Sequence, residues 1–186
     1  ALDVLLYCCV RRRRLRGVSD GFVGATHIVG LKPCAVMLAR DLMVGPPGGL
    51  QVLAQMTVAF ASRGHSLLAV QEVPADQVRR YGIVAGTPAG ERLIQLERIV
   101  EKPAPEAAPS RMGVAGRYIL TPRIFDEIRQ QTPGAGGEIQ LTDAIARLMS
   151  KEAVYAYQYN GNRYDCGSKE GFLQATVELA LQHPQM

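Results

Sequence analysis

Two apolar runs on either side of an amphipathic stretch give the clearest pattern in the first half of the chain. Residues 34–38 form a compact apolar run of the kind that fills a buried strand of a parallel sheet. Apolar residues then recur at helical spacing from Leu53 to Arg63, and Gly64 is a common helix stop. Residues 66–73 form a second buried run. This order of strand, helix and strand predicts a βαβ unit.

The rest of the chain alternates between strand-like and helix-like patterns. A glycine-rich turn at residues 86–90 is expected between two strand-like runs, and a helical apolar period begins at Leu141. Ser168 is a suitable cap for a last helix. Its apolar face would consist of Leu173, Val177, Ala180 and Leu181. The strand-like runs are residues 81–84, 92–100, 117–120 and 153–159. These patterns predict an α/β fold.

Residues 1–33 differ from the rest in pattern and in charge. They show no clear hydrophobic period, and they hold six basic and two acidic residues. The remainder holds 15 of each, so the whole formal net charge of +4 falls in this segment. We predict an atypical basic segment at residues 1–33 that packs poorly, followed by one α/β domain at residues 34–186.

The arginine cluster at residues 11–14 raises nucleic-acid and membrane binding as alternatives. No aromatic side chains interleave the cluster and no recognition motif follows it, so no nucleic-acid partner is expected. No apolar run approaches the roughly 20 residues that span a bilayer. The charges also follow the apolar start, the reverse of a secretory signal. The four cysteines lack metal-ligand spacing, and a reducing cytoplasm is the expected location.

Glu101, Lys102 and Pro103 follow a predicted strand directly. In an open α/β sheet, ligands bind beyond the carboxyl ends of the strands. A carboxylate there can accept hydrogen bonds from sugar hydroxyls, and a neighbouring lysine can neutralise a phosphate. An ordinary surface ion pair is the competing interpretation, and the tripeptide alone favours it.

Asp165 lies between a strand and a helix, where a carboxylate is well placed for Mg²⁺, which prefers oxygen ligands. A helix-capping aspartate is the alternative. Residues 134–143 combine a glycine-rich loop with a helix start, as a phosphate cradle does. They lack the lysine and the serine or threonine of a P-loop, so nucleoside triphosphate binding is not expected there.

Five segments occur in order along the chain, at residues 81–84, 100–103, 116–118, 133–145 and 164–167. The longest reads P-G-A-G-G-E-I-Q-L-T-D-A-I and is the most specific. Together they resemble bacterial UTP–glucose-1-phosphate uridylyltransferase, also called UDP-glucose pyrophosphorylase. The similarity extends from about Pro33 to the end of the chain.

The resemblance implies a Rossmann-like nucleotidyltransferase fold with a mixed, mostly parallel sheet. It implies a reaction in which a phosphate oxygen of glucose 1-phosphate attacks the α-phosphorus of UTP, forming UDP-glucose and pyrophosphate. Such chemistry needs positioning and charge neutralisation more than a covalent nucleophile. The resemblance further implies UTP and glucose 1-phosphate as partners, Mg²⁺ as cofactor and a homo-oligomer.

The resemblance also assigns roles on the sugar-phosphate side of the site. Gly82 would approach the sugar closely, and Glu101 would hold its hydroxyls. Lys102, as a catalytic residue, would neutralise the sugar phosphate. The sugar pocket would be lined by Val114 and Gly116.

The implied metal site departs from the family pattern. Asp165, also a catalytic residue, would supply one of two carboxylates that hold Mg²⁺. The other should follow the strand that ends at Leu38, but the matching position is Arg40, with Asp41 beside it. Arg40 puts a positive charge where Mg²⁺ should lie.

Other departures concern the nucleotide side. The family's glycine-rich UTP loop is not found before Cys34, so we expect an N-terminally truncated fold. Only Gly17 remains of a G-L-G-H-A motif, and Arg12 replaces a base-contacting glutamine. Arg111 replaces an asparagine of the sugar loop. Impaired activity is therefore expected. The alternatives are a non-catalytic remnant that keeps a sugar-phosphate half-site or an interaction surface, and a transferase for another nucleotide or sugar.

Overall fold

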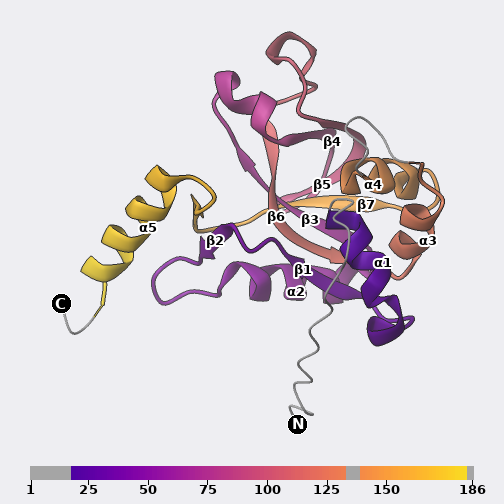
Figure 1. Ribbon diagram of the computed structural model, residues 1–186, viewed down its shortest axis with the longest axis horizontal. Helices are drawn as coiled ribbons and strands as arrows, with labels where there is room; N and C mark the ends of the chain where they lie inside the picture. The colour runs from indigo at the N-terminus through magenta and orange to yellow at the C-terminus, as the bar shows by residue number, and fades with distance from the viewer. Residues whose placement is uncertain (1–17, 133–138, 184–186) are drawn as a thin grey trace.

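The computed structural model describes residues 18–132 and 139–183, which form a six-stranded mixed sheet with helices on both faces and a second, two-stranded sheet (Figure 1). The elements run, in chain order, as α1 (Val18–Val29), β1 (Cys34–Met37), β2 (Asp41–Val44), α2 (Val52–Arg63), β3 (Ser66–Glu72), η1 (Ala75–Arg80), β4 (Gly82–Gly90), β5 (Leu93–Glu101), η2 (Pro105–Ala107), β6 (Met112–Leu120), α3 (Arg123–Arg129), α4 (Leu141–Met149), β7 (Val154–Gln158), β8 (Asn162–Asp165) and α5 (Lys169–Leu181).

The strand order of the large sheet is β1-β6-β3-β7-β5-β4, with an additional pairing between β6 and β4. β1, β3, β7 and β4 run in one direction, and β6 and β5 run in the other. The mixed α/β fold is thereby confirmed. Among the described strands, however, β3 and β7 form the one parallel pair, so the expectation of mostly parallel pairing is wrong. The reason is that β6 lies between β1 and β3, and β5 lies between β7 and β4.

β3 is the central buried strand, as its continuous apolar run predicts. Leu67 and Ala69 pack on the α2 face, whereas Leu68 and Val70 pack on the face covered by α3 and α4. β1, by contrast, is an edge strand on which burial alternates, and Met37 is 59% exposed. The prediction of a fully buried strand at residues 34–38 is therefore wrong.

Local helix signals agree with the structure. α2 ends at Arg63, and Gly64 follows in the left-handed conformation with φ 70°. α4 buries its apolar face through Ala144, Ile145 and Leu148. Ser168 caps α5 by accepting a hydrogen bond from the Gly171 N–H.

For residues 18–29 alone, the structure differs from the expectation of a poorly packed segment at residues 1–33. Residues 18–29 form α1, which contacts α3. Val23 and Val29 pack against the main core cluster. The four arginines at residues 11–14, like the rest of residues 1–17, lie outside the described part of the chain.

The glycine-rich sequence at residues 86–90 is not a turn but the second half of β4. Register shifts accommodate it opposite β5. A Cβ atom at Gly86 would lie 1.8 Å from the Gln95 carbonyl oxygen. Glycine is needed here because two backbones approach each other closely, a typical use of glycine within a strand.

The small sheet pairs β2 with β8 and leads into α5, which extends away from the main body in Figure 1. Its register places Asp41 opposite Asp165. No described helix combines the length and apolar character needed to cross a membrane.

Candidate functional site

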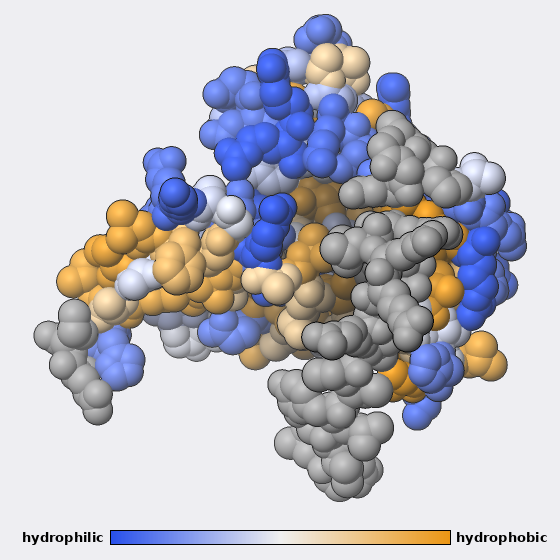
Figure 2. Space-filling view, in the orientation of Figure 1, coloured by the Kyte–Doolittle hydropathy of each residue, from blue (hydrophilic) through white to orange (hydrophobic). Residues whose placement is uncertain are grey.

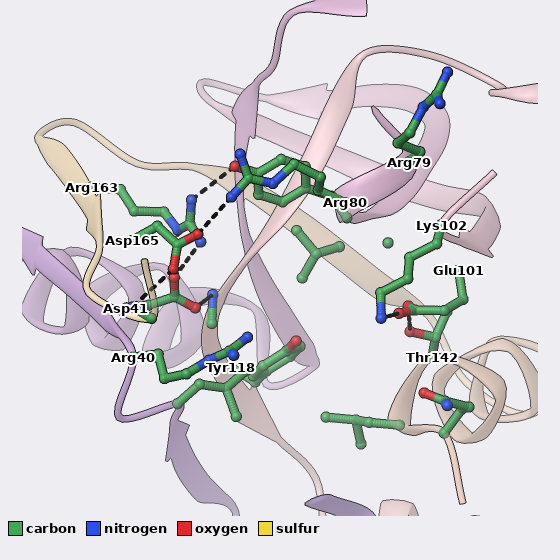
Figure 3. Close-up of a pocket in the computed structure, with 18 of the residues that line it drawn as sticks. Arg40, Asp41, Arg79, Arg80, Glu101, Lys102, Tyr118, Thr142, Arg163 and Asp165 are labelled. Atoms are coloured by element: carbon green, nitrogen blue, oxygen red, sulfur yellow. Dashed lines mark hydrogen bonds and ion pairs between the residues drawn. The ribbon is translucent and has the colours of Figure 1, made fainter. Parts of the chain in front are cut away.

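A pocket of about 900 Å³ lies where the large and small sheets meet (Figure 3). It brings together all the site residues that the sequence predicts, although they are far apart along the chain: Gly82, Glu101, Lys102, Val114, Gly116 and Asp165. The fold therefore places residues from separate segments of the chain around one cleft. The arrangement has two sides, with Glu101 and Lys102 on one and Asp41 and Asp165 on the other.

The first side is built from the starts and ends of paired strands. Gly82, at the start of β4, pairs with Glu101, at the end of β5. A Cβ atom at Gly82 would lie 3.2 Å from Glu101 Oε2, 3.5 Å from Thr142 Oγ1 and 3.8 Å from Val114 Cγ2. The absent side chain therefore leaves space beside two oxygen groups and one methyl group.

Glu101 is held in place for hydrogen bonding. The Thr142 hydroxyl, from α4, donates to Glu101 Oε2 at 2.6 Å. The other oxygen, Oε1, lies 3.8 Å from Lys102 Nζ. Both residues of this ion pair line the pocket, and the Thr142 side chain orients the carboxylate.

Lys102 has a backbone conformation that is unusual for a residue with a side chain. Its φ is 45°, in the left-handed region. Its N–H donates to the Tyr81 carbonyl oxygen at 2.9 Å, which fixes the chain after β5. The side chain is 62% exposed, so its ammonium group remains available to a ligand. Strain of this kind is concentrated at functional sites.

The opposite side of the pocket centres on a buried ion pair. Arg163 Nε donates to Asp41 Oδ1 at 2.7 Å, and each side chain is only 10% exposed. The other oxygen, Asp41 Oδ2, accepts from the Gly116 N–H at 3.1 Å. A Cβ atom at Gly116 would lie 2.1 Å from Asp41 Oδ2, so glycine is required for this contact.

Arg163, in β8, also contacts Tyr81, the residue that precedes β4. Its Nη1 donates to the Tyr81 hydroxyl at 3.0 Å. Burial acts to lower the pKa of Arg163, but the Asp41 carboxylate and Tyr81 outweigh it and leave the pKa above its usual value. The guanidinium group is therefore a permanent positive charge in the wall of the pocket.

Asp165 lies opposite Asp41 at the end of β8. Arg80 Nη2 donates to its Oδ2 at 2.9 Å, and the Gly167 N–H donates to its Oδ1 at 3.1 Å. Because Ser168 caps α5, the alternative of Asp165 as the side-chain cap is not the observed arrangement.

Tyr118 adds a hydroxyl group to the lining of the pocket. Burial raises its pKa well above the usual range, and the Glu101 and Asp41 carboxylates raise it further. The hydroxyl therefore stays protonated at neutral pH and can donate a hydrogen bond to a ligand.

The described residues do not fit a protein-held Mg²⁺. None of them form a group of three or more His, Cys, Asp or Glu that could hold a metal ion. Asp165 pairs with Arg80, and both Asp41 oxygens already accept hydrogen bonds. Arg40 lines the same pocket. A divalent cation would have to displace these donors while lying near an uncompensated guanidinium group.

Comparison with known proteins gives the family. A model of the nucleotidyl transferase family matches residues 5–182. The chain belongs to the nucleotidyl transferase family. It is 41% identical over 177 residues to a UTP–glucose-1-phosphate uridylyltransferase of Staphylococcus epidermidis, covering 95% of this chain and 60% of the relative. It is 40% identical over 175 residues to the enzyme of the same name from Pseudomonas aeruginosa, covering 94% and 62%.

A solved structure agrees with this assignment. A UDP-glucose pyrophosphorylase complexed with UDP-glucose has a TM-score of 0.89 and 37% identity, covering 94% of this chain and 66% of that one. The resemblance found in the sequence is thereby confirmed. The chain spans about three-fifths of the length of these curated relatives. The individual roles of the six site residues stay predictions.

The sequence patterns do not identify several of the pocket residues as members of the site. They are Asp41 in its ion pair, Arg80, Tyr118, Thr142 and Arg163. Thr142 and Tyr118 lie inside the family-like segments, so those segments were the signal that could have identified them. Arg111, predicted in the sugar loop, instead pairs with Glu72 and does not line the pocket. Arg12, Gly17 and residues 134–138 of the glycine-rich loop lie outside the described chain.

Proposed function

We propose that this nucleotidyl transferase chain carries the sugar-phosphate side of a site that forms UDP-glucose and pyrophosphate from UTP and glucose 1-phosphate. The observation that carries the proposal is the convergence of Gly82, Glu101 and Lys102 with Asp165 in one pocket. The names of the relatives support the choice of substrates. A cytoplasmic location is part of the proposal, because UTP is an intracellular metabolite.

In this proposal the chain acts by positioning and by charge. Glu101, oriented by Thr142, accepts hydrogen bonds from sugar hydroxyls. The Lys102 ammonium group neutralises the sugar phosphate, whose oxygen attacks the α-phosphorus of UTP. In this proposal the divalent cation is Mg²⁺. It reaches the site bound to UTP, because the Asp165 carboxylate is already paired with Arg80.

Replacing Glu101 tests the proposal directly. Glu101→Ala removes the hydroxyl-binding carboxylate and should weaken glucose 1-phosphate binding about 10-fold or more, as for a lost hydrogen bond to a charged group. Isothermal titration calorimetry measures the affinity. Glu97→Ala removes an exposed carboxylate from the same strand, outside the pocket, and should leave binding unchanged. Equal affinities of the two variants for glucose 1-phosphate would contradict the proposal.

A second candidate function is a sugar-phosphate half-site without turnover. Arg40, where the family pattern predicts a metal-binding carboxylate, favours it. An assay for UDP-glucose with UTP, glucose 1-phosphate and Mg²⁺ separates the two. Binding without product formation by the chain supports the half-site, whereas formation of UDP-glucose supports the transferase.

A homo-oligomer is also part of the proposal, supported by the surface of α5. The predicted apolar face of this helix is not buried in the chain, since Leu173, Val177 and Leu181 are all exposed. Figure 2 shows an apolar surface along the projecting helix. The exposed apolar side chains on α5 form a surface that a second copy of the chain would cover.

Charged substitutions on α5 test this association. Leu173→Glu combined with Val177→Glu should convert an oligomer into a monomer, because two carboxylates would have to be buried without partners. Sedimentation velocity measures the change in mass. Thr57→Glu on the exposed side of α2 is a control that should leave the mass unchanged. An oligomer that persists in the double variant would rule out the α5 surface as the contact.

A further inference from the structure

Arg40 is a pocket cation without a partner in the described part of the chain. It lies in the turn between β1 and β2, and its carbonyl oxygen accepts from the Cys166 N–H at 2.8 Å. This contact fixes the Arg40 backbone against the segment that follows β8. Its side chain lines the pocket and makes no hydrogen bond or ion pair with residues 18–132 or 139–183.

The Arg40 side chain and the Asp165 carboxylate lie against the same glycine. A Cβ atom at Gly167 would lie 2.9 Å from Arg40 Cδ, 3.0 Å from Arg40 Nε and 3.0 Å from Asp165 Oδ1. Figure 3 shows Arg40 extending from the Asp41 side of the pocket toward Tyr118. The guanidinium group is therefore close to the carboxylate that the family resemblance assigns to a divalent cation.

The pocket has a surplus of positive charge. Each of its three acidic residues already has an arginine or lysine partner. Arg40 and Arg79 line the same pocket and have no such partner within the described residues. Two additional guanidinium groups favour a ligand with about two negative charges, as a phosphate monoester carries at neutral pH.

We propose that the Arg40 guanidinium binds the phosphate of a phosphorylated sugar in place of a protein-held divalent cation, so that this binding step requires no metal. The inference rests on the proposed function for the class of ligand. A guanidinium group suits the task because its planar fork of N–H donors bonds phosphate oxygens in pairs and keeps its charge. A carboxylate at this position would repel the phosphate unless a cation lay between them.

The first test measures glucose 1-phosphate binding to the whole chain by calorimetry, in EDTA and in MgCl₂. The wild-type dissociation constant should agree between the two conditions within about twofold. Arg40→Gln removes the charge with little change in size, and should weaken binding about 10-fold or more in both conditions. Arg98→Gln makes the same change at an exposed position of β5 outside the pocket and should have no effect.

The second test introduces the carboxylate that the family pattern would have at this position. Arg40→Asp should bind Mn²⁺, detected by electron paramagnetic resonance, whereas the wild-type chain should not. Glucose 1-phosphate binding by this variant should require a divalent cation. Circular dichroism establishes that each variant is folded before it is compared.

Three results would overturn the role of Arg40: wild-type binding only in MgCl₂, wild-type affinity of Arg40→Gln in EDTA, or equal Mn²⁺ binding by the wild type and Arg40→Asp. The results also distinguish failure of the Arg40 role from failure of the proposed function. If Glu101→Ala loses glucose 1-phosphate affinity and Arg40→Gln does not, the function stands and the role of Arg40 fails. If the chain binds inorganic phosphate through Arg40 but does not bind glucose 1-phosphate, the anion site stands and the proposed sugar specificity fails.

Discussion

Asp41→Ala is expected to lower the free energy of unfolding by about 3–5 kcal/mol, the range for removing one partner of a buried ion pair. The Asp41 and Arg163 side chains are each 10% exposed, so the substitution would leave the Arg163 charge largely buried without its partner. The substitution also removes the acceptor of the Gly116 N–H. The expected loss is a large fraction of the roughly 5–15 kcal/mol that stabilises a typical domain.

Chemical denaturation measures this loss, and Asp126→Ala is its matched control. Asp126 also pairs with an arginine, Arg129, but its side chain is 65% exposed. Removing an exposed pair should cost less than about 1 kcal/mol. The double variant Asp41→Ala with Arg163→Met should recover much of the stability, because no buried charge then lacks a partner. Equal losses for Asp41→Ala and Asp126→Ala would contradict burial of the pair.

Local sequence patterns predict those helices and strands whose ends and buried faces are set by residues within or next to the element. The period of α4 predicts its buried face, Gly64 marks the end of α2, and Ser168 marks the start of α5. The continuous apolar run of β3 predicts a strand covered on both faces. These signals are short-range, and they report burial and capping rather than strand order.

The order of the strands depends on contacts between residues far apart in the sequence, and it could not be predicted from local patterns. β6 pairs with β1, β3 and β4, yet only its last residues have a strand-like pattern in the sequence. β2 and β8 contain four residues each, too few for a period to be recognised. Their pairing is nevertheless what places Asp41 opposite Asp165.

The candidate site was predictable where it coincides with family-like segments. Those segments contain Gly82, Glu101, Lys102, Gly116 and Asp165, and the structure places all of them in one pocket. The pairing of the two aspartates was not predictable, because it joins residues 122 positions apart for Asp41 and 85 positions apart for Asp165. The ion pairs matter for function, since they decide which charges remain available to a ligand.

The conformation of Lys102 provides a way to separate function from stability. With φ 45°, Lys102 occupies a region that costs residues with a Cβ atom about 1–2 kcal/mol and that glycine enters freely. Lys102→Gly should therefore leave the free energy of unfolding unchanged or raise it by up to about 2 kcal/mol. The Tyr81 contact, which uses the backbone N–H of residue 102, can persist in the variant.

Ligand binding should change in the opposite direction. Lys102→Gly removes the ammonium group that we assign to the sugar phosphate, and a charge-assisted contact of this kind is typically worth about 10- to 100-fold in affinity. Calorimetry with glucose 1-phosphate and chemical denaturation of the same samples measure both effects. Lys32→Ala, at an exposed lysine outside the pocket, is the matched control and should preserve affinity. If Lys102→Gly destabilises the chain and keeps its affinity, Lys102 is a structural residue; if it keeps its stability and loses its affinity, the strained backbone is maintained for binding.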